Sequence, residues 1–271
     1  MLFRSTEFFV KNPGSTTGSC VSGSPPCLGS NTFAFTGGGS IQEAPVVDSS
    51  TGRVFLSGTQ SGGTSGSYLI QTDTALSAGS VQAAQIGVGT ANAVHPGTPD
   101  NNYFTNVSTG RFYACGQNTN GEGQLFAFGF NSSGVLSTTP VSGSPFALGQ
   151  AATVNAPCSD GLTEIFNQSG STDWLFLGVA NRCVNTMFGG NGCVISFNIT
   201  SAFPSAVANQ IQVVGTTGPT GIIVDNVTDA GATTITTDIY YIMPTGKSCL
   251  DYLGSSHTGT CAVSATQSGL Q

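Results

Sequence analysis

Hydrophobic and polar positions alternate over short distances along most of the chain. Brief runs of apolar, β-branched and aromatic residues are separated by clusters of Gly, Ser, Asn and Pro. Apolar residues at helical spacing are almost absent, whereas short strands bounded by turn residues produce this pattern. The pattern predicts an all-β protein built from short strands.

One arrangement of residues recurs about every 60 positions. Asp48, Asn106, Asn167 and Asp225 lie 58, 61 and 58 residues apart, and each closes a short stretch that we expect to be a first strand: PVVD, YFTN, EIFN and IIVD. After each comes a turn and a second expected strand, at 54–56, 112–114, 174–177 and 239–242. After a loop comes a third, at 68–70, 125–128, 194–197 and 262–264. A fourth strand closes the earlier repeats, as at 210–214.

Two nearly identical turns join the first and second expected strands. They are VVDSSTGRVFLSG at 46–58 and FTNVSTGRFYACG at 104–116. Asp or Asn accepts hydrogen bonds from a turn backbone, and Gly supplies a positive φ angle. We therefore interpret the shared Ser-Thr-Gly-Arg as architecture rather than chemistry.

Four short antiparallel strands at this period predict the blades of a β-propeller. A small sheet cannot bury both faces alone, so such sheets stack face to face around an axis. We expect a single propeller domain, 1–271, of about five units. They are a partial blade at 1–41, blades at 42–91, 92–151 and 152–217, and a partial blade at 218–271.

The two outer units are predicted to be incomplete. In the first unit, 8–10, 31–35 and 39–41 match second, third and fourth strands, so that its first strand would precede residue 1. The last unit stops after its third strand. This pattern predicts an N-terminally truncated chain.

Composition excludes several classes of partner. Charged residues make up 7% of the 271 residues, the formal net charge is −7, and there are six Lys plus Arg. Nucleic acids and anionic membranes both require basic surfaces, so neither is an expected partner. No stretch approaches the roughly 18 apolar residues of a membrane helix, and the N-terminal residues lack the apolar core of a signal peptide.

The eight cysteines predict disulfide bonds, with buried free thiols as the alternative. Their number is even and none forms a CxxC or a zinc-spaced cluster. Disulfides imply an oxidising compartment, so we expect an extracellular, periplasmic or cell-envelope protein. The repeat places three pairs across equivalent loops and leaves one long-range pair. The pairs are Cys20–Cys27, Cys183–Cys193, Cys249–Cys261 and Cys115–Cys158.

The chain resembles the secreted bacterial β-propellers of the NHL/YVTN and quinoprotein-like superfamilies. The residues that carry the resemblance are PVVDSSTGRVFLSG, NVSTGRFYACG and the C-terminal GTCAVSATQSGLQ. The resemblance implies a propeller fold and a binding role rather than a reaction. The single Trp174 departs from the recurring tryptophan of the quinoprotein repeat, so we expect no quinone and no other cofactor.

The sequence contains few residues that could take part in catalysis or bind a metal. The sequence has no Gly-x-Ser-x-Gly, no His-Glu-x-x-His and no phosphate loop, so it nominates no catalytic residue and no metal ligand. Neither histidine has a ligand-spaced partner in the sequence. The repeat places Glu43 among the loop acids of the cysteine-bearing face. The weak candidates for ligand binding on that face are His95, Asp100, Glu122, Asp160, Asp251 and His257.

Three hypotheses of function stay open. The first is a disulfide-stapled binding or structural module at a cell surface or envelope, whose partner is a glycan, a protein or another surface ligand. The second is a propeller lyase, hydrolase or quinoprotein-like enzyme with its site on the cysteine-bearing face. It requires His95 or His257 to meet two carboxylates around a pocket. The third is a self-assembling surface or fibre subunit that pairs by strand addition.

Overall fold

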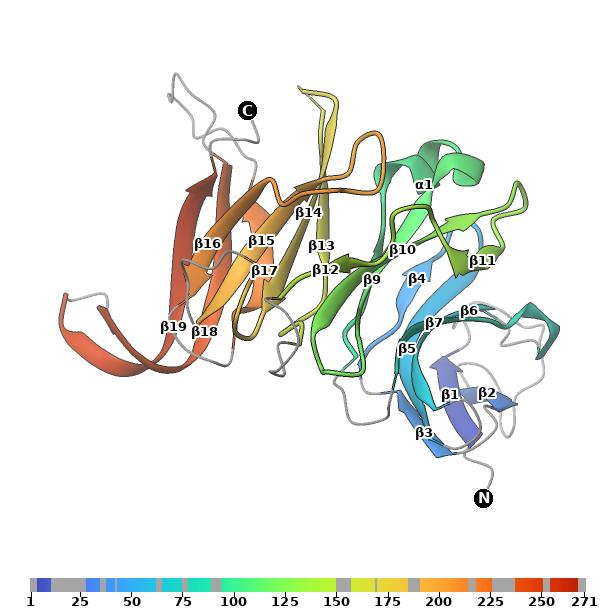
Figure 1. The fold of residues 1–271 in the computed structure, drawn as a ribbon. Coiled ribbons are helices and arrows are strands. Elements are labelled where there is room, and N and C mark those ends of the chain that lie inside the picture. The colour runs from blue at the N-terminus through green and yellow to red at the C-terminus, as the bar shows by residue number, and fades with distance from the viewer. Residues whose placement is uncertain are drawn as a thin grey trace.

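The computed structural model is an all-β protein that contains several antiparallel sheets (Figure 1). It describes residues 4–10, 28–34, 38–41, 43–61, 65–74, 78–88, 94–149, 157–168, 170–184, 191–213, 218–225, 237–250 and 254–267. The all-β class predicted from the sequence is confirmed. Within the described residues, no helix has the length and apolar composition to cross a lipid bilayer.

The strands form one small sheet and four larger groups, here called layers. The small sheet is β1 (Arg4–Val10) and β2 (Leu28–Ala34). The β5 layer holds β3 (Gly38–Ile41), β4 (Val46–Asp48), β5 (Arg53–Ser61), β6 (Gly66–Asp73) and β7 (Gln82–Val88). The β9 layer holds β8 (Thr98–Pro99), β9 (Arg111–Gln117), β10 (Gly123–Phe130), β11 (Leu136–Pro140) and β12 (Phe146–Ala147).

The remaining strands complete the other two layers. The β14 layer holds β13 (Thr163–Asn167), β14 (Thr172–Val179), β15 (Gly192–Asn198) and β16 (Asn209–Val213). The β18 layer holds β17 (Thr220–Asp225), β18 (Thr237–Leu250) and β19 (Ser256–Gln267). Short helical turns are α1 (Asn101–Thr105), η1 (Ala78–Ser80) and η2 (Val107–Thr109). The expected second and third strands of the repeat all overlap observed strands.

The first quoted turn folds as the sequence predicts. Asp48 pairs with Arg53 across the β4–β5 hairpin, and its Oδ1 accepts a hydrogen bond from Ser50 N at 2.9 Å. Gly52 has a φ of +68°, the region that favours glycine. The turn residues therefore close the hairpin, and the other carboxylate oxygen of Asp48 accepts a hydrogen bond from Tyr103 OH at 2.8 Å.

The second quoted turn differs, and the expected strand YFTN is wrong. Residues of this stretch form α1, because Asp100 caps the helix by accepting a hydrogen bond from Tyr103 N at 3.0 Å. Tyr103 is buried, and its ring lies 6.0 Å from that of Phe55. The first strand of this layer is instead the two-residue β8. Gly110 has a φ of −67° rather than a positive value.

The expected fourth strand at 39–41 also pairs differently. β3 lies against β5, with Gly38 opposite Ser61 and Ile41 opposite Gly58. β4 covers only the first part of β5. β3 therefore covers the rest of that edge and satisfies backbone groups that would otherwise be unpaired. It belongs to the β5 layer and not to the N-terminal unit.

The layers pack face to face in chain order. Alternate residues of β9 point to opposite sides, as expected of a strand: Phe112 packs in a core with the β5 layer, and Tyr113 packs in a core with the β14 layer. The rings of Phe55 and Phe112 stack with centroids 4.4 Å apart. β14 repeats this alternation, since Leu175 faces the β9 layer and Trp174 faces the β18 layer. Both faces of the two central layers thus contribute to apolar cores. Each large apolar side chain that is fully buried there stabilises the folded state by roughly 1.5–3 kcal/mol.

Glycine allows the β5 and β9 layers to touch. In the described residues the two layers share one ladder pair, the parallel pair Gly87 and Gln117. A Cβ atom on Gly116 would lie 1.4 Å from the carbonyl oxygen of Ile86, so no larger residue fits there. The contact joins the two layers into one ten-stranded sheet.

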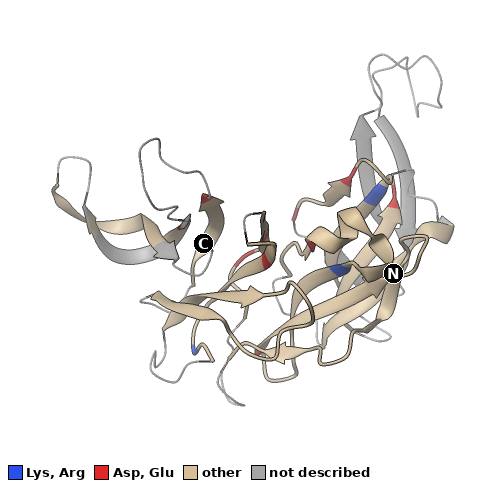
Figure 2. Ribbon diagram, turned by 90° about the horizontal axis from the view of Figure 1, so that it is seen from above, with Lys and Arg blue, Asp and Glu red and all other residues tan. Residues whose placement is uncertain are grey.

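Three disulfides lie within the described residues: Cys115–Cys158, Cys183–Cys193 and Cys249–Cys261. They are the pairs that the repeat predicts for these six residues. The expected fourth pair, Cys20–Cys27, falls outside the described residues. Charged positions are sparse on the described ribbon seen from above (Figure 2). The layers are joined mainly by apolar cores, and Cys115–Cys158 links β9 to the segment before β13.

Candidate functional site

Three segments that lead into the first strands of consecutive layers meet at one point. Glu43 stands three residues before the first residue of β4, His95 three before that of β8, and Asp160 three before that of β13. We call residues 43–45, 95–97 and 160–162 the lead-in segments. The three side chains therefore come from one register position of the repeat.

The side chains of Glu43, His95 and Asp160 converge. Nδ1 of His95 lies 2.7 Å from Oε1 of Glu43. One nitrogen or oxygen atom of each of the three residues lies within 4.8 Å of the others. The side chain of His95 is 14% exposed and that of Glu43 is 35% exposed. The group is therefore partly shielded but open to small ligands from solvent.

Hydrogen bonds fix the orientation of the Asp160 carboxylate. Its Oδ1 accepts from Gly161 N at 2.8 Å, and its Oδ2 accepts from Gly221 N at the start of β17. The neighbouring Ser159 donates its hydroxyl to Pro219 O. The lead-in segment of β13 is thereby tied to the segment that precedes β17, which belongs to the next layer.

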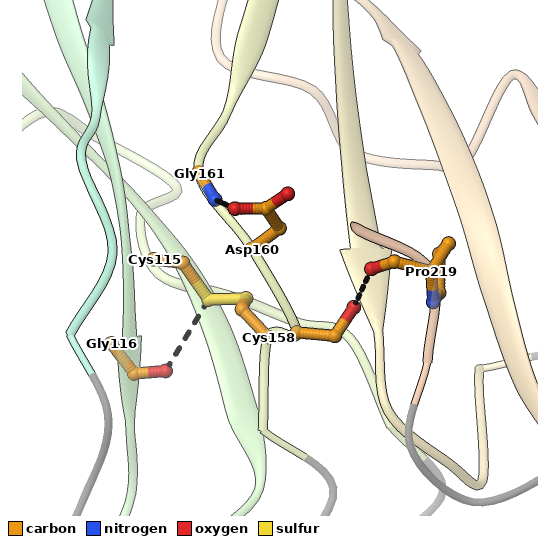
Figure 3. Close-up of a disulfide and its surroundings, with 7 residues drawn as sticks. Cys115, Gly116, Cys158, Asp160, Gly161 and Pro219 are labelled. Carbon is orange, nitrogen blue, oxygen red and sulfur yellow. Dashed lines mark hydrogen bonds between the residues drawn. A yellow bond between two sulfur atoms is a disulfide. The ribbon is translucent and has the colours of Figure 1, made fainter. Parts of the chain in front are cut away.

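The Cys115–Cys158 disulfide anchors the same segment on its other side. Figure 3 shows this disulfide beside Asp160 and Gly161, with Pro219 opposite. Cys158 also bridges to Val179 of β14. The segment is thus fastened to the β9, β14 and β18 layers, so Asp160 stands on a rigid support.

The His95 segment is bound to the Asp160 segment through the backbone. Leu162 N donates a hydrogen bond to Pro96 O at 3.1 Å. A Cβ atom on Gly161 would lie 3.2 Å from that same oxygen. This close contact sets the distance between the two side chains.

The donor set suits two kinds of chemistry. An imidazole nitrogen and two carboxylates are ligands of divalent transition-metal ions. A histidine hydrogen-bonded to a carboxylate can also act as a general base. Either role fits the geometry of Glu43, His95 and Asp160.

Among the described residues, the other predicted candidates do not join this group. Asp100 is fully buried and accepts a hydrogen bond from Arg111 N at 2.9 Å. It therefore lies at the end of β9 opposite to Cys115, and its expected place on the cysteine-bearing face is wrong. The reason is that β8 ends before Asp100 rather than after it.

Glu122 and His257 have local surroundings. Oε2 of Glu122 accepts from Asn118 Nδ2 at 2.8 Å within the β9–β10 turn, so this acid closes its own hairpin. His257 is an exposed residue of β19 opposite Cys249. Asp251 lies outside the described residues.

A second group of acids lies between the β9 and β14 layers; it comprises Asp100, Asp173 and the half-buried Glu164, of which the sequence nominates only Asp100. Asp173 is buried, and its Oδ2 accepts a hydrogen bond from Asn101 N at 2.9 Å. Burial raises the pKa of Asp100 to about 6, although hydrogen bonds from Arg111 and Tyr103 oppose the rise. Burial, together with the adjacent Asp173 carboxylate, raises the pKa of Glu164 to about 9.

Two cavities in the described part of the chain lie apart from the Glu43 group. One of about 350 Å³ lies between β7 and the β9–β10 hairpin, and one of about 290 Å³ lies beside β16. Neither is lined by Glu43, His95 or Asp160. Of the two conditions set for an enzyme, the structure meets the gathering of His95 with two carboxylates, while these cavities do not supply the pocket.

Sequence spacing could not predict the convergence, although one signal was present. His95 and Asp160 were candidates, but Glu43, 52 residues before His95, was only one of several loop acids. Counting back three residues from each first strand would have selected all three. That count fails without the structure, because the sequence predicts the first strand of the second repeat at 103–106, whereas the observed first strand is β8.

The chain matches no protein-family model, and no curated protein or solved structure is significantly similar to it.

Proposed function

We propose that the chain is a β-propeller of the NHL/YVTN kind that works as a binding module in an extracytoplasmic, oxidising compartment. Antiparallel layers that follow the repeat and pack face to face in chain order support the propeller arrangement. Three disulfides within the described residues support the oxidising compartment.

The convergence of Glu43, His95 and Asp160 carries this proposal. In a propeller, the first strand of each blade lies nearest the axis, so equivalent residues that precede these strands meet at one end of the axis. Residues presented in this way form a natural ligand site on a rigid scaffold. The binding face is thus the face of the lead-in segments.

The ligand class follows from the chemistry of this face. Two carboxylates and an imidazole offer acceptors and a donor for hydroxyl and amide groups. Phosphate-rich ligands are disfavoured because the carboxylates would repel them, and the chain has only six Lys plus Arg. A glycan or a polar protein surface is the ligand that we propose.

Array binding tests the proposal. The wild-type chain and the double variant Glu43→Gln/His95→Ala are compared on arrays of immobilised glycans and secreted proteins. We expect saturable binding by the wild type and at least a tenfold loss in the variant. His257→Ala, which changes the other histidine, is the matched control and should bind as the wild type does.

Two results would contradict the binding module. One is an absence of saturable binding by the folded wild type. The other is equal binding by the wild type and the double variant, because the lead-in face would then not be the site.

The enzyme hypothesis is the second candidate, favoured by the 2.7 Å contact between His95 and Glu43. A general base held by a carboxylate would convert a bound ligand rather than retain it. Mass spectrometry of array ligands after incubation separates the two functions. Cleavage that is lost in His95→Ala supports the enzyme, and unchanged ligand supports the binding module.

A further inference from the structure

We propose that Glu43, His95 and Asp160 bind one divalent transition-metal ion, with Zn²⁺ as the best match. The inference deepens the proposed function and rests on it in one respect, since the ion would be the group through which the lead-in face holds its ligand.

The distances leave room for an ion after a small adjustment. Zinc lies about 2.0–2.2 Å from nitrogen and oxygen ligands in a tetrahedral site. Neighbouring ligand atoms are then about 3.4 Å apart by that geometry. Here the ligand atoms lie within 4.8 Å of one another, and the Glu43–His95 pair is at 2.7 Å. The Glu43–His95 pair therefore has to widen by less than about 1 Å, which the exposed side chain of Glu43 permits. A pair at the 4.8 Å limit would have to close by about 1.4 Å.

Charge favours a cation at this point. Two carboxylates meet there, and that of Glu43 lies 2.7 Å from Nδ1 of His95. Within the described residues, the other ion pair joins Arg111 to Asp100, at the far end of β9. A divalent ion would neutralise the charge of both carboxylates.

Two ligands are preorganised. The Asp160 carboxylate already accepts hydrogen bonds from Gly161 N and Gly221 N, and each of its oxygens keeps a further lone pair for a metal. Such outer hydrogen bonds orient a ligand and typically change metal affinity by 10–100-fold. The bond between Leu162 N and Pro96 O holds the His95 segment at a fixed distance.

The donor set selects the ion. One imidazole and two carboxylates are the nitrogen and oxygen donors that Zn²⁺ accepts, whereas Ca²⁺ takes six to eight oxygen ligands. Three protein ligands leave a coordination position open, as in catalytic rather than structural zinc sites. A hydroxyl, carbonyl or carboxylate of a ligand would occupy it.

Titration of the full chain with ZnCl₂ by calorimetry, after treatment with a chelator and dialysis, tests the site. We expect one ion per chain in the wild type. We expect at least tenfold weaker binding in Glu43→Gln and a larger loss in His95→Ala. His257→Ala should bind zinc as the wild type does. Glu43→Gln changes only an exposed side chain, so its fold is expected to survive.

The outcomes separate this inference from the proposed function. Absence of 1:1 binding, or wild-type affinity in both Glu43→Gln and His95→Ala, would overturn the metal site. Array binding that persists in the zinc-free chain and still depends on Glu43 would leave the binding module standing without the metal. If the chain binds zinc but shows no saturable binding to any array ligand, the metal site is supported and the binding module is contradicted.

Discussion

Buried carboxyl groups give single residues a measurable effect on the whole fold. The pKa of Asp100 is raised to about 6 and that of Glu164 to about 9, in both cases mainly by burial. Such groups favour the protonated form in the folded chain. Each contributes stability that is present below its unfolded pKa and is lost as the pH rises through its folded pKa.

Asp48 acts in the opposite direction. Partial burial would raise its pKa, but hydrogen bonds from Ser50, Thr51 and Tyr103 outweigh burial and hold the pKa well below its usual range. Its contribution is therefore present above its unfolded pKa and is lost as the pH falls.

We predict that stability is highest near pH 4–5 and declines towards pH 9. The midpoint of urea unfolding, measured from pH 3 to pH 9, checks this. Glu164→Gln should flatten the decline above pH 6, because an amide cannot lose the proton. A midpoint that rises steadily from pH 5 to pH 8 would contradict the assignment of Glu164 as a raised carboxyl.

At the scale of elements, the hairpins were the most predictable part of the fold. Each has apolar alternation on both strands and turn residues between them, so local signals agree. Residues 103–106 resemble the other expected first strands in their apolar residues, but they follow Pro99 and Asp100. A cap at Asp100 and burial of Tyr103 turn it into a helix, because capping and packing override strand propensity.

The disulfides differ in the length of chain they close, and this predicts an order of stability. Cys115 and Cys158 are 43 residues apart, whereas Cys183 and Cys193 are 10 apart. In the loop-entropy picture the longer bridge contributes about 4 kcal/mol and the shorter about 3 kcal/mol.

Urea unfolding of two double variants checks that order. Cys115→Ala/Cys158→Ala should lose more free energy of unfolding than the matched control Cys183→Ala/Cys193→Ala. The reverse order, or no loss from the first variant, would argue that Cys115–Cys158 does not anchor the segment that carries Asp160.

At the scale of the whole molecule, face-to-face packing of the layers brings residues at equivalent positions of the repeat close together in space. The period of about 60 residues predicted the layers. It could not predict the site, because Glu43, His95 and Asp160 belong to three different layers and are joined by no local motif. Their convergence depends on tertiary contacts such as that between Leu162 and Pro96.

A crystal structure of the chain grown with ZnCl₂, with diffraction data collected above the zinc absorption edge, tests the central claim most directly. We predict one strong anomalous peak within about 2.0–2.2 Å of Glu43, His95 Nδ1 and Asp160, between lead-in segments of consecutive layers. Layers that do not pack face to face, or a map in which these three side chains lie apart with no peak between them, would contradict the account.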